Sequence, residues 1–190
     1  MQRLVRGLGR TLVDYGHHLV AFRPNARLYL LHVILAGSAM GVFRLLFNFF
    51  ALSLGFDEAL LGNLVTTSSV TALIVALPMG YLADTLGRKA ALLISAACTS
   101  LAIATMVLFP SQSMLLAMNV VFGIAQSLAG VTMSPFLMEN SGEHERTYLF
   151  SFGQGLQMVS ASVGNWIGGY LPTWVGSLRS VDAVSSQAYG

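Results

Sequence analysis

Charged residues are scarce in this chain of 190 residues, since Asp, Glu, Lys and Arg together make up only 9% of it. Soluble domains carry about 25% charged residues, so the deficit argues against a soluble protein and favours lipid as the surrounding solvent. The formal net charge of +2 is small, and no basic stripe alternates with aromatic residues, which argues against nucleic acid as a partner. Cysteine is nearly absent as well: Cys98 stands alone and cannot form an internal disulfide.

Signatures of catalysis are also missing from the sequence. The metalloprotease pattern H-E-x-x-H and the serine-hydrolase pattern G-x-S-x-G do not occur. No pair of aspartates lies inside an apolar stretch, which makes an intramembrane enzyme a weak hypothesis. We therefore do not expect an enzyme, and we expect no catalytic residue, no metal and no cofactor.

Long uncharged stretches are what the sequence does contain. A membrane helix needs about 20 mostly apolar residues, and five segments meet this requirement, the first of them interrupted only by Arg44. The motif FPSQS at 109–113 divides one uncharged run into two spans, because proline and serine favour a turn. We expect the last span to end near Pro172. The sequence thus predicts an all-α membrane protein with about five transmembrane helices, at 28–53, 59–83, 90–109, 114–138 and 148–171.

The basic residues of the loops are divided unequally between the two sides of these spans. Arg179 falls alone on one side, and the other side receives Arg3, Arg6, Arg10, Arg23, Arg27, Arg88, Lys89 and Arg146. Cytoplasmic loops carry the excess of Lys and Arg. We therefore expect a cytoplasmic N-terminus, in a multi-pass protein of the plasma or inner membrane.

The chain divides into three parts on this basis. Residues 1–27 form a cytoplasmic segment, whose amphipathic pattern favours a helix on the membrane surface over a frayed tail. Residues 28–171 hold the five helices. Residues 172–190 form an extracytoplasmic tail that we expect to lead to a sixth helix missing from this sequence.

The turn between the second and third spans concentrates charges and glycines, in the sequence GYLADTLGRKAALL at 80–93. Asp84 and Arg88 lie four residues apart at the membrane edge, and so short a loop makes the two spans an antiparallel hairpin. Gly87 lets the chain turn through backbone angles that other residues avoid, and Gly80 lets another helix approach closely. A rigid charged turn of this kind can act as a gate, whose ion pairs form in one conformation and break in another.

The same turn resembles the loop signature of the major facilitator superfamily (MFS) of transporters, G-x-L-A-D-x-x-G-R-K. The matching residues are Gly80, Leu82, Ala83, Asp84, Gly87, Arg88 and Lys89. In that family the signature lies between helices two and three on the cytoplasmic side, where the span count and the charge distribution put it here. An ordinary positive-inside loop would explain Arg88 and Lys89. It would not explain the presence of Gly80, Asp84 and Gly87 together. The resemblance implies about twelve helices in two six-helix bundles, of which this chain would be most of the first, an incomplete N-terminal bundle.

A second charged region follows the fourth span. Glu139 and Arg146 match an acidic residue and an arginine that many members of the family carry at this interval. By resemblance, the two would join Asp84 and Arg88 in a cytoplasmic charge cluster whose closure favours the outward-open state. The alternative is a solvated loop, since the stretch EHER is charged in any case.

The fifth span carries the pattern G-x8-G-N-x-x-G-G, formed by Gly155, Gly164, Asn165, Gly168 and Gly169. It is similar to the antiporter-associated signature of the family's exporters. That signature has a proline where Asn165 stands, which puts the exporter reading in doubt. The alternative is a set of small residues at a helix interface, which a bundled membrane helix needs in any case.

Polar side chains inside the predicted spans outline a candidate solute path. An arginine near a helix centre costs about 2.5–3.5 kcal/mol on insertion scales, so Arg44 needs a partner or a wet cavity. No Asp or Glu lies inside a span; Arg44 therefore pairs with an acid in missing sequence or faces an anionic solute. The candidates for the path are Arg44, Asn48, Asn119, Gln126, Gln154 and Gln157. For the amides alone, interhelical hydrogen bonding is the alternative.

Two of the spans repeat one spacing of glycine and polar residues. The first span has Gly37, Gly41, Arg44 and Asn48 on one face, and the fourth has Asn119, Gly123, Gln126 and Gly130. Spans one and four are equivalent helices in an architecture of three-helix inverted repeats. The face of the first span should therefore look into the bundle.

These observations predict the N-terminal part of an MFS secondary transporter that moves a small solute by alternating access. Its partners would be the lipid bilayer, a small solute that is anionic if Arg44 contacts it, and the missing C-terminal half. The alternative is a non-transporting fragment or scaffold that needs a partner chain, because five helices cannot supply a second bundle.

Overall fold

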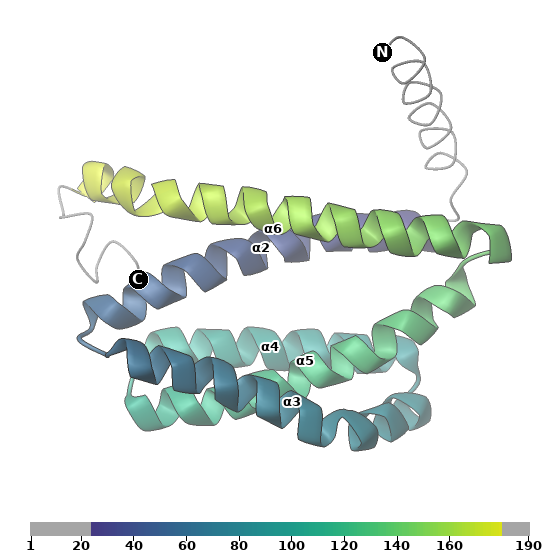
Figure 1. Ribbon diagram of the computed structural model, residues 1–190, viewed down its shortest axis with the longest axis horizontal. Coiled ribbons are helices and arrows are strands. Elements are labelled where there is room, and N and C mark those ends of the chain that lie inside the picture. Colours follow the sequence, from purple (N-terminus) through teal and green to yellow (C-terminus); the bar gives the residue numbers. More distant parts are fainter. Residues whose placement is uncertain (1–23, 180–190) are drawn as a thin grey trace, which may run out of the picture.

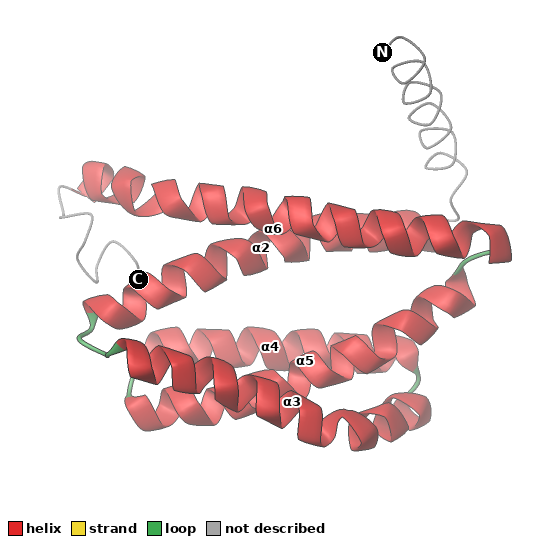
Figure 2. Ribbon diagram, viewed as in Figure 1, coloured by secondary structure: helices red, strands yellow, loops and turns green. Residues whose placement is uncertain are grey.

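The computed structural model describes residues 24–179, which form five helices and no strand (Figure 1, Figure 2). The helices are α2 (Pro24–Ser53), α3 (Glu58–Leu86), α4 (Arg88–Leu108), α5 (Gln112–Asn140) and α6 (Glu143–Arg179). The all-α class and one long helix for each predicted span are therefore confirmed. The surface helix predicted for residues 1–27 lies almost wholly outside the described residues.

Four of these helices are long and apolar enough to cross a membrane, over Leu28–Ser53, Glu58–Leu86, Arg88–Leu108 and Gln112–Glu139. Within the described residues α6 is not among them, because glutamines, an asparagine and several glycines dilute its apolar residues. The fifth helix is thus present where the sequence predicts it. Its crossing of the bilayer stays a prediction.

Local capping explains where two of the helices begin. The carboxylate of Asp57 accepts the backbone N–H of Leu60 at 2.8 Å and so caps α3. The hydroxyl of Ser111 accepts the N–H of Met114 at 3.4 Å and caps α5. The turn that FPSQS predicts between the third and fourth spans is therefore confirmed.

The helix itself does not stop at the proline expected to end the last span, because α6 continues through Pro172 to Arg179; the end of the span stays a prediction. Proline removes one backbone donor and directs its ring at the carbonyl four residues earlier. Membrane helices tolerate this when neighbouring groups satisfy the freed carbonyl, and Pro172 is buried. Prolines also lie inside α3, at Pro78, and inside α5, at Pro135.

The helices pack as a pair and a group of three. α2 lies along α6, while α5 packs against both α3 and α4 (Figure 1). α2 makes only sparse contacts with α3 and α5. The α3–α4 and α5–α6 turns lie at one end of the molecule, which we call the Asp84 end, and the α2–α3 and α4–α5 turns lie at the other, the Asp57 end (Figure 1).

Small residues let α2 and α6 approach backbone to backbone. A Cβ atom on Gly164 would overlap the carbonyl oxygen of Ser38, and one on Gly41 would overlap the carbonyl oxygen of Ala161. Gly168 continues the same contact one turn further along α6. This is the small-xxx-small packing of membrane helices. Small residues let the two backbones approach closely, and the resulting van der Waals contacts stabilise the pair in lipid.

α3 and α5 meet in the same way. A Cβ atom on Gly123 would lie 2.5 Å from the carbonyl oxygen of Ser68, so the two backbones are close there. One turn along, the hydroxyl of Ser127 donates to the carbonyl of Ala72 at 2.9 Å. A hydroxyl that bonds across the interface adds to the packing of two helices in a medium without water.

The two close pairs are related as an inverted repeat requires. α2 and α6 are the first and fifth predicted spans, and α5 and α3 are the fourth and second. Exchanging spans one with four and two with five converts one pair into the other. Gly41 and Gly123, which hold equivalent places in the repeated spacing, make the close contact in their respective pairs.

Buried apolar clusters show how the pair joins the group of three. At the Asp84 end, Leu30 of α2, Leu137 of α5 and Leu149 of α6 form one core. At the Asp57 end the buried residues come from α3, α4 and α5, and α2 reaches them through the partly buried Phe47. Apolar contacts therefore join the pair to the group of three at both ends, and a cavity lies between them toward the Asp57 end.

Candidate functional site

Gly87 forms the whole turn between α3 and α4. Its φ of 84° and ψ of 144° lie where residues with a Cβ rarely go, so the turn requires glycine. Gly80 behaves differently, because no described atom lies within 4 Å of the place that a Cβ would occupy. The close approach of another helix, expected at Gly80, is not seen in the described part of the chain.

Replacing Gly87 with alanine is expected to destabilise the protein by about 1–3 kcal/mol, the usual cost of such backbone angles for a residue with a Cβ. Gly80→Ala is the matched control, because it adds the same methyl group to open space and removes a glycine from a helix. The fraction of protein that stays monodisperse after heating in detergent measures both. A control that loses as much stability as Gly87→Ala would contradict the expectation.

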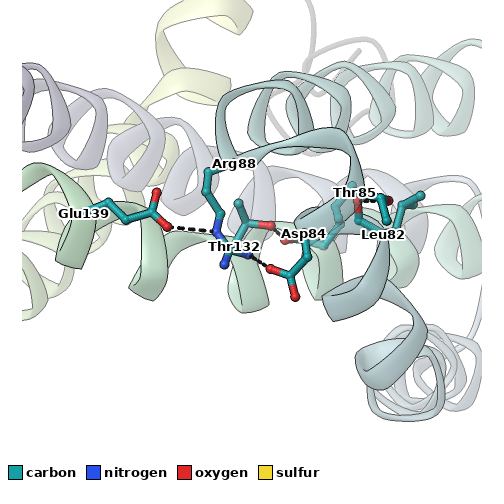
Figure 3. Close-up of polar contacts among 7 residues, drawn as sticks. Leu82, Asp84, Thr85, Arg88, Thr132 and Glu139 are labelled. Carbon is teal, nitrogen blue, oxygen red and sulfur yellow. Dashed lines mark hydrogen bonds and ion pairs between the residues drawn. The ribbon is translucent and has the colours of Figure 1, made fainter.

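Arg88 links three helices at the Asp84 end (Figure 3). Its Nη1 forms an ion pair with Asp84 of α3, and its Nε lies 3.5 Å from Oε1 of Glu139 of α5. We call Asp84, Arg88 and Glu139 the charge chain. The side chain of Arg88 is 25% exposed, against 61% for Asp84 and 59% for Glu139. Solvent screens such pairs, which contribute about 0–1 kcal/mol each. The ion pairs of the charge chain can therefore break and re-form at a small cost in free energy.

Arg146 lies beside the charge chain but bonds to the backbone. Its Nη2 donates to the carbonyl of Met138 at 2.9 Å, near the C-terminal end of α5, as basic side chains often do at helix ends. No ion pair joins it to Glu139 in the described residues, and its buried Nε has no partner there. Arg146 therefore holds the start of α6 against the end of α5 rather than extending the charge chain.

A shallow hollow of about 530 Å³ lies over the charge chain. Gly87, Arg88, Lys89 and Glu139 line it together with apolar residues of α4 and α5. Lys89 is exposed and forms no ion pair with a described residue. Within residues 24–179 no group of three or more His, Cys, Asp or Glu side chains is arranged to hold a metal ion.

A cavity of about 280 Å³ lies toward the Asp57 end, between α2 and the group of three. Ser69 of its wall and Asp84 of the charge chain lie on the same helix, about 22 Å apart at 1.5 Å per residue. The residues that line the cavity are Phe43, Arg44, Phe47, Asn48, Leu61, Leu64, Val65, Ser68, Ser69, Met106, Asn119 and Phe122. Three residues of the predicted solute path, Arg44, Asn48 and Asn119, are thus brought together.

Arg44 is the only charged residue in this lining. It is exposed and forms no ion pair with a described residue. Asn119 is 8% exposed, and its Nδ2 donates to the carbonyl of Leu115 at 3.0 Å and to the Sδ of Met106 at 3.7 Å. Arg44 therefore lines the cavity without an ion pair to a described residue, whereas the amide donors of Asn119 are used inside the protein.

Sequence comparison identifies the family to which this arrangement belongs. The family model of the Major Facilitator Superfamily matches residues 29–184. The chain belongs to the major facilitator superfamily. Comparisons with curated proteins and with solved structures found no match. The MFS is a family of transporters rather than enzymes, so the chain is a multi-pass membrane protein of a transporter family.

The other residues predicted for the solute path of this MFS chain do not reach the cavity. Gln154 and Gln157 are exposed on α6, which forms no part of the cavity wall. Gln126 is half-buried on α5 and is also absent from the lining. The side of each helix that faces a cavity depends on how its neighbours are packed, so polar character alone did not separate these residues from Arg44.

The glycine pattern of α6 divides between two environments. Gly164 and Gly168 pack against α2, whereas Gly155 has no described atom within 4 Å of a Cβ. Gly169 makes an ordinary contact with α2, and Asn165 is exposed. Gly164 and Gly168 support the interpretation of this pattern as a helix interface. The interpretation as an exporter signature stays a prediction.

Sequence reasoning missed the aromatic wall of the cavity. Phe43 and Phe47 flank Arg44 along α2, with ring centroids 5.2 Å apart, and Phe122 of α5 lies 6.5 Å from Phe43. Phe43 and Phe47 lie four residues apart on either side of an intramembrane arginine, and this spacing could have predicted an aromatic wall beside Arg44. Phe122 carried no such signal, because only the packing of α5 brings it to α2.

Proposed function

We propose that this MFS chain is the N-terminal part of a secondary active transporter, which moves a small solute across the cell membrane by alternating access. Rocking of helix bundles about a central site is the mechanism by which such transporters work. The observation that carries the proposal is the separation of two features along one bundle. The cavity with Arg44 lies toward the Asp57 end, and the charge chain lies at the Asp84 end, where an apolar core joins α2, α5 and α6.

The excess of Lys and Arg makes the Asp84 end the cytoplasmic one in this proposal. The charge chain then closes the cytoplasmic side while the cavity is accessible from outside. Breaking the pairs of Arg88 would let the bundle open toward the cytoplasm. Their small individual free energies suit this role, since a strong latch would trap one conformation.

Release of solutes across a sealed membrane tests transport even before the substrate is identified. Proteoliposomes that contain the protein, loaded with a mixed pool of metabolites, are transferred to buffer and their contents measured over time by mass spectrometry. We expect a restricted set of chemically related solutes to leave faster than from protein-free liposomes.

A second arm separates a transporter from a leak. Labelled solute of the identified class is added outside vesicles preloaded with the unlabelled form, and a transporter is expected to accumulate the label transiently above its equilibrium level. Identical contents in protein-containing and protein-free vesicles would instead favour a scaffold without transport activity.

A further inference from the structure

The cavity that contains Arg44 has an uneven distribution of charge. A single positive side chain, and no negative one, stands among its lining residues. Its guanidinium offers five N–H donors in a planar fork and cannot be deprotonated in a protein. An acidic group on a bound solute can satisfy that fork, whereas a cation would be repelled and a neutral solute would leave the charge unmatched.

The rest of the lining is mainly apolar and aromatic. Phe43, Phe47 and Phe122 form a continuous wall, with ring centroids 5.2 Å apart for the first pair and 6.5 Å for Phe43 and Phe122. Aliphatic side chains of α3 extend this wall. Rings pack best against other rings at such distances, and a hydrated inorganic anion or a sugar would lose its water here without replacement.

The polar groups beside Arg44 are few. Asn48 lies one helical turn after it, and Ser68 and Ser69 of α3 also line the cavity. The hydroxyl of Ser68 donates to the carbonyl of Val65 at 3.0 Å, so its own proton is already used. Arg44 is the one cation in the lining, so one acidic group balances the charge of the cavity, and the volume of about 280 Å³ limits the size of the remainder.

We propose that the solute bound in this cavity is a small organic monoanion with an aromatic or branched apolar body. The acidic group would bind Arg44 and Asn48, and the apolar body would pack on the three phenylalanines. This inference rests on the proposed transport function, and it adds the chemical class of the solute and the residues that select it.

Equilibrium binding to the protein in lipid nanodiscs tests the inference with three related probes. Benzenesulfonate has both an acidic group and a ring, methanesulfonate lacks the ring, and benzenesulfonamide is neutral near pH 7. We expect benzenesulfonate to bind about 10- to 100-fold more tightly than benzenesulfonamide, because the neutral probe cannot form a charge-assisted hydrogen bond with Arg44. Methanesulfonate is expected to bind about 10-fold more weakly, because it buries no ring.

Two variants assign the selectivity to residues. Arg44→Gln is expected to weaken benzenesulfonate about 10- to 100-fold and to leave benzenesulfonamide within about 3-fold. Phe122→Leu is expected to weaken benzenesulfonate about 3- to 10-fold with methanesulfonate unchanged. Phe109→Leu, at an exposed phenylalanine outside the lining, is the matched control. Because each variant is judged by the ratio of two probes, a misfolded protein, which loses both, is recognised.

The outcomes separate the solute class from the transport function. Equal binding of charged and neutral probes, or an unchanged ratio in Arg44→Gln, would overturn the anion inference. Exchange of a neutral or cationic solute in the vesicle experiment would overturn it too, while supporting transport. Selective binding of benzenesulfonate without any exchange would support the site and contradict the proposed transport.

Discussion

Replacing Gly164 with alanine is expected to force α2 and α6 apart and to cost about 1–3 kcal/mol of stability, the usual cost of overpacking. The added Cβ would overlap the carbonyl oxygen of Ser38 and come within 2.9 Å of its Cα. Both are backbone atoms, so no rotation of a side chain can relieve the clash. The whole of α2, with Arg44 at the cavity, would have to shift.

The expected loss can be measured by heating the protein in detergent and recording the temperature at which half of it stays monodisperse. Gly155→Ala is the matched control, because it lies on the same helix and in the same glycine pattern but has no described atom within 4 Å of a Cβ. Its stability should be unchanged or slightly raised, since alanine favours a helix by about 1 kcal/mol over glycine. Equal losses in the two variants would mean that the pattern acts through something other than contact with α2.

Replacing Arg88 with glutamine is expected to open the Asp84 end and to shift the population away from the state in which the cavity is reached from outside. One change removes both pairs of the charge chain, to Asp84 and to Glu139. At about 0.2–1 kcal/mol for each exposed pair, the loss of both pairs should move the equilibrium by a factor of about 2 to 30. Folding should be little affected, because the pairs are solvent-screened and lie outside the apolar clusters.

A cysteine in the cavity reports this shift. With Cys98→Ser as the background, Ser69→Cys is labelled on intact cells by a maleimide that cannot cross the membrane. Adding Arg88→Gln should slow labelling, by at most the factor given above, because the labelling rate follows the fraction of protein in the outward-accessible state. Lys89→Gln is the matched control, since it removes the neighbouring positive charge and breaks no described ion pair. If both substitutions slow labelling equally, net charge rather than the charge chain sets the equilibrium.

The charged turn shows how far local sequence can predict a site. Gly87 and the i, i+4 pair of Asp84 and Arg88 are close along the chain, so their spacing alone brings them together. Glu139 is 51 residues from Arg88, and its approach was expected only from family resemblance. Arg146, which the same resemblance assigned to the cluster, bonds instead to the carbonyl of Met138, as basic side chains often do at the C-terminal end of a helix.

The cavity was harder to predict from sequence. Arg44 was recognisable because a charge in an apolar span is costly wherever it lies. Gln154 and Gln157 are polar but uncharged, so they cost less in an apolar span than Arg44 does. They lie on α6, which is outside the cavity wall. An amide can be satisfied by lipid-interface water or by a neighbouring helix, so its presence does not by itself identify a solute path.

Composition and hydrophobic runs determined by themselves that this is an all-α membrane protein with long helices joined by short turns. Apolar runs of about 20 residues match the length of a membrane helix, which satisfies its backbone groups internally. The tertiary structure alone decided which helices pair and where the cavity lies. Glycines that look alike in the sequence, such as Gly155 and Gly164, differ only in what stands opposite them. Contact between faces of distant helices depends on their relative rotation and crossing, and a one-dimensional pattern does not contain that information.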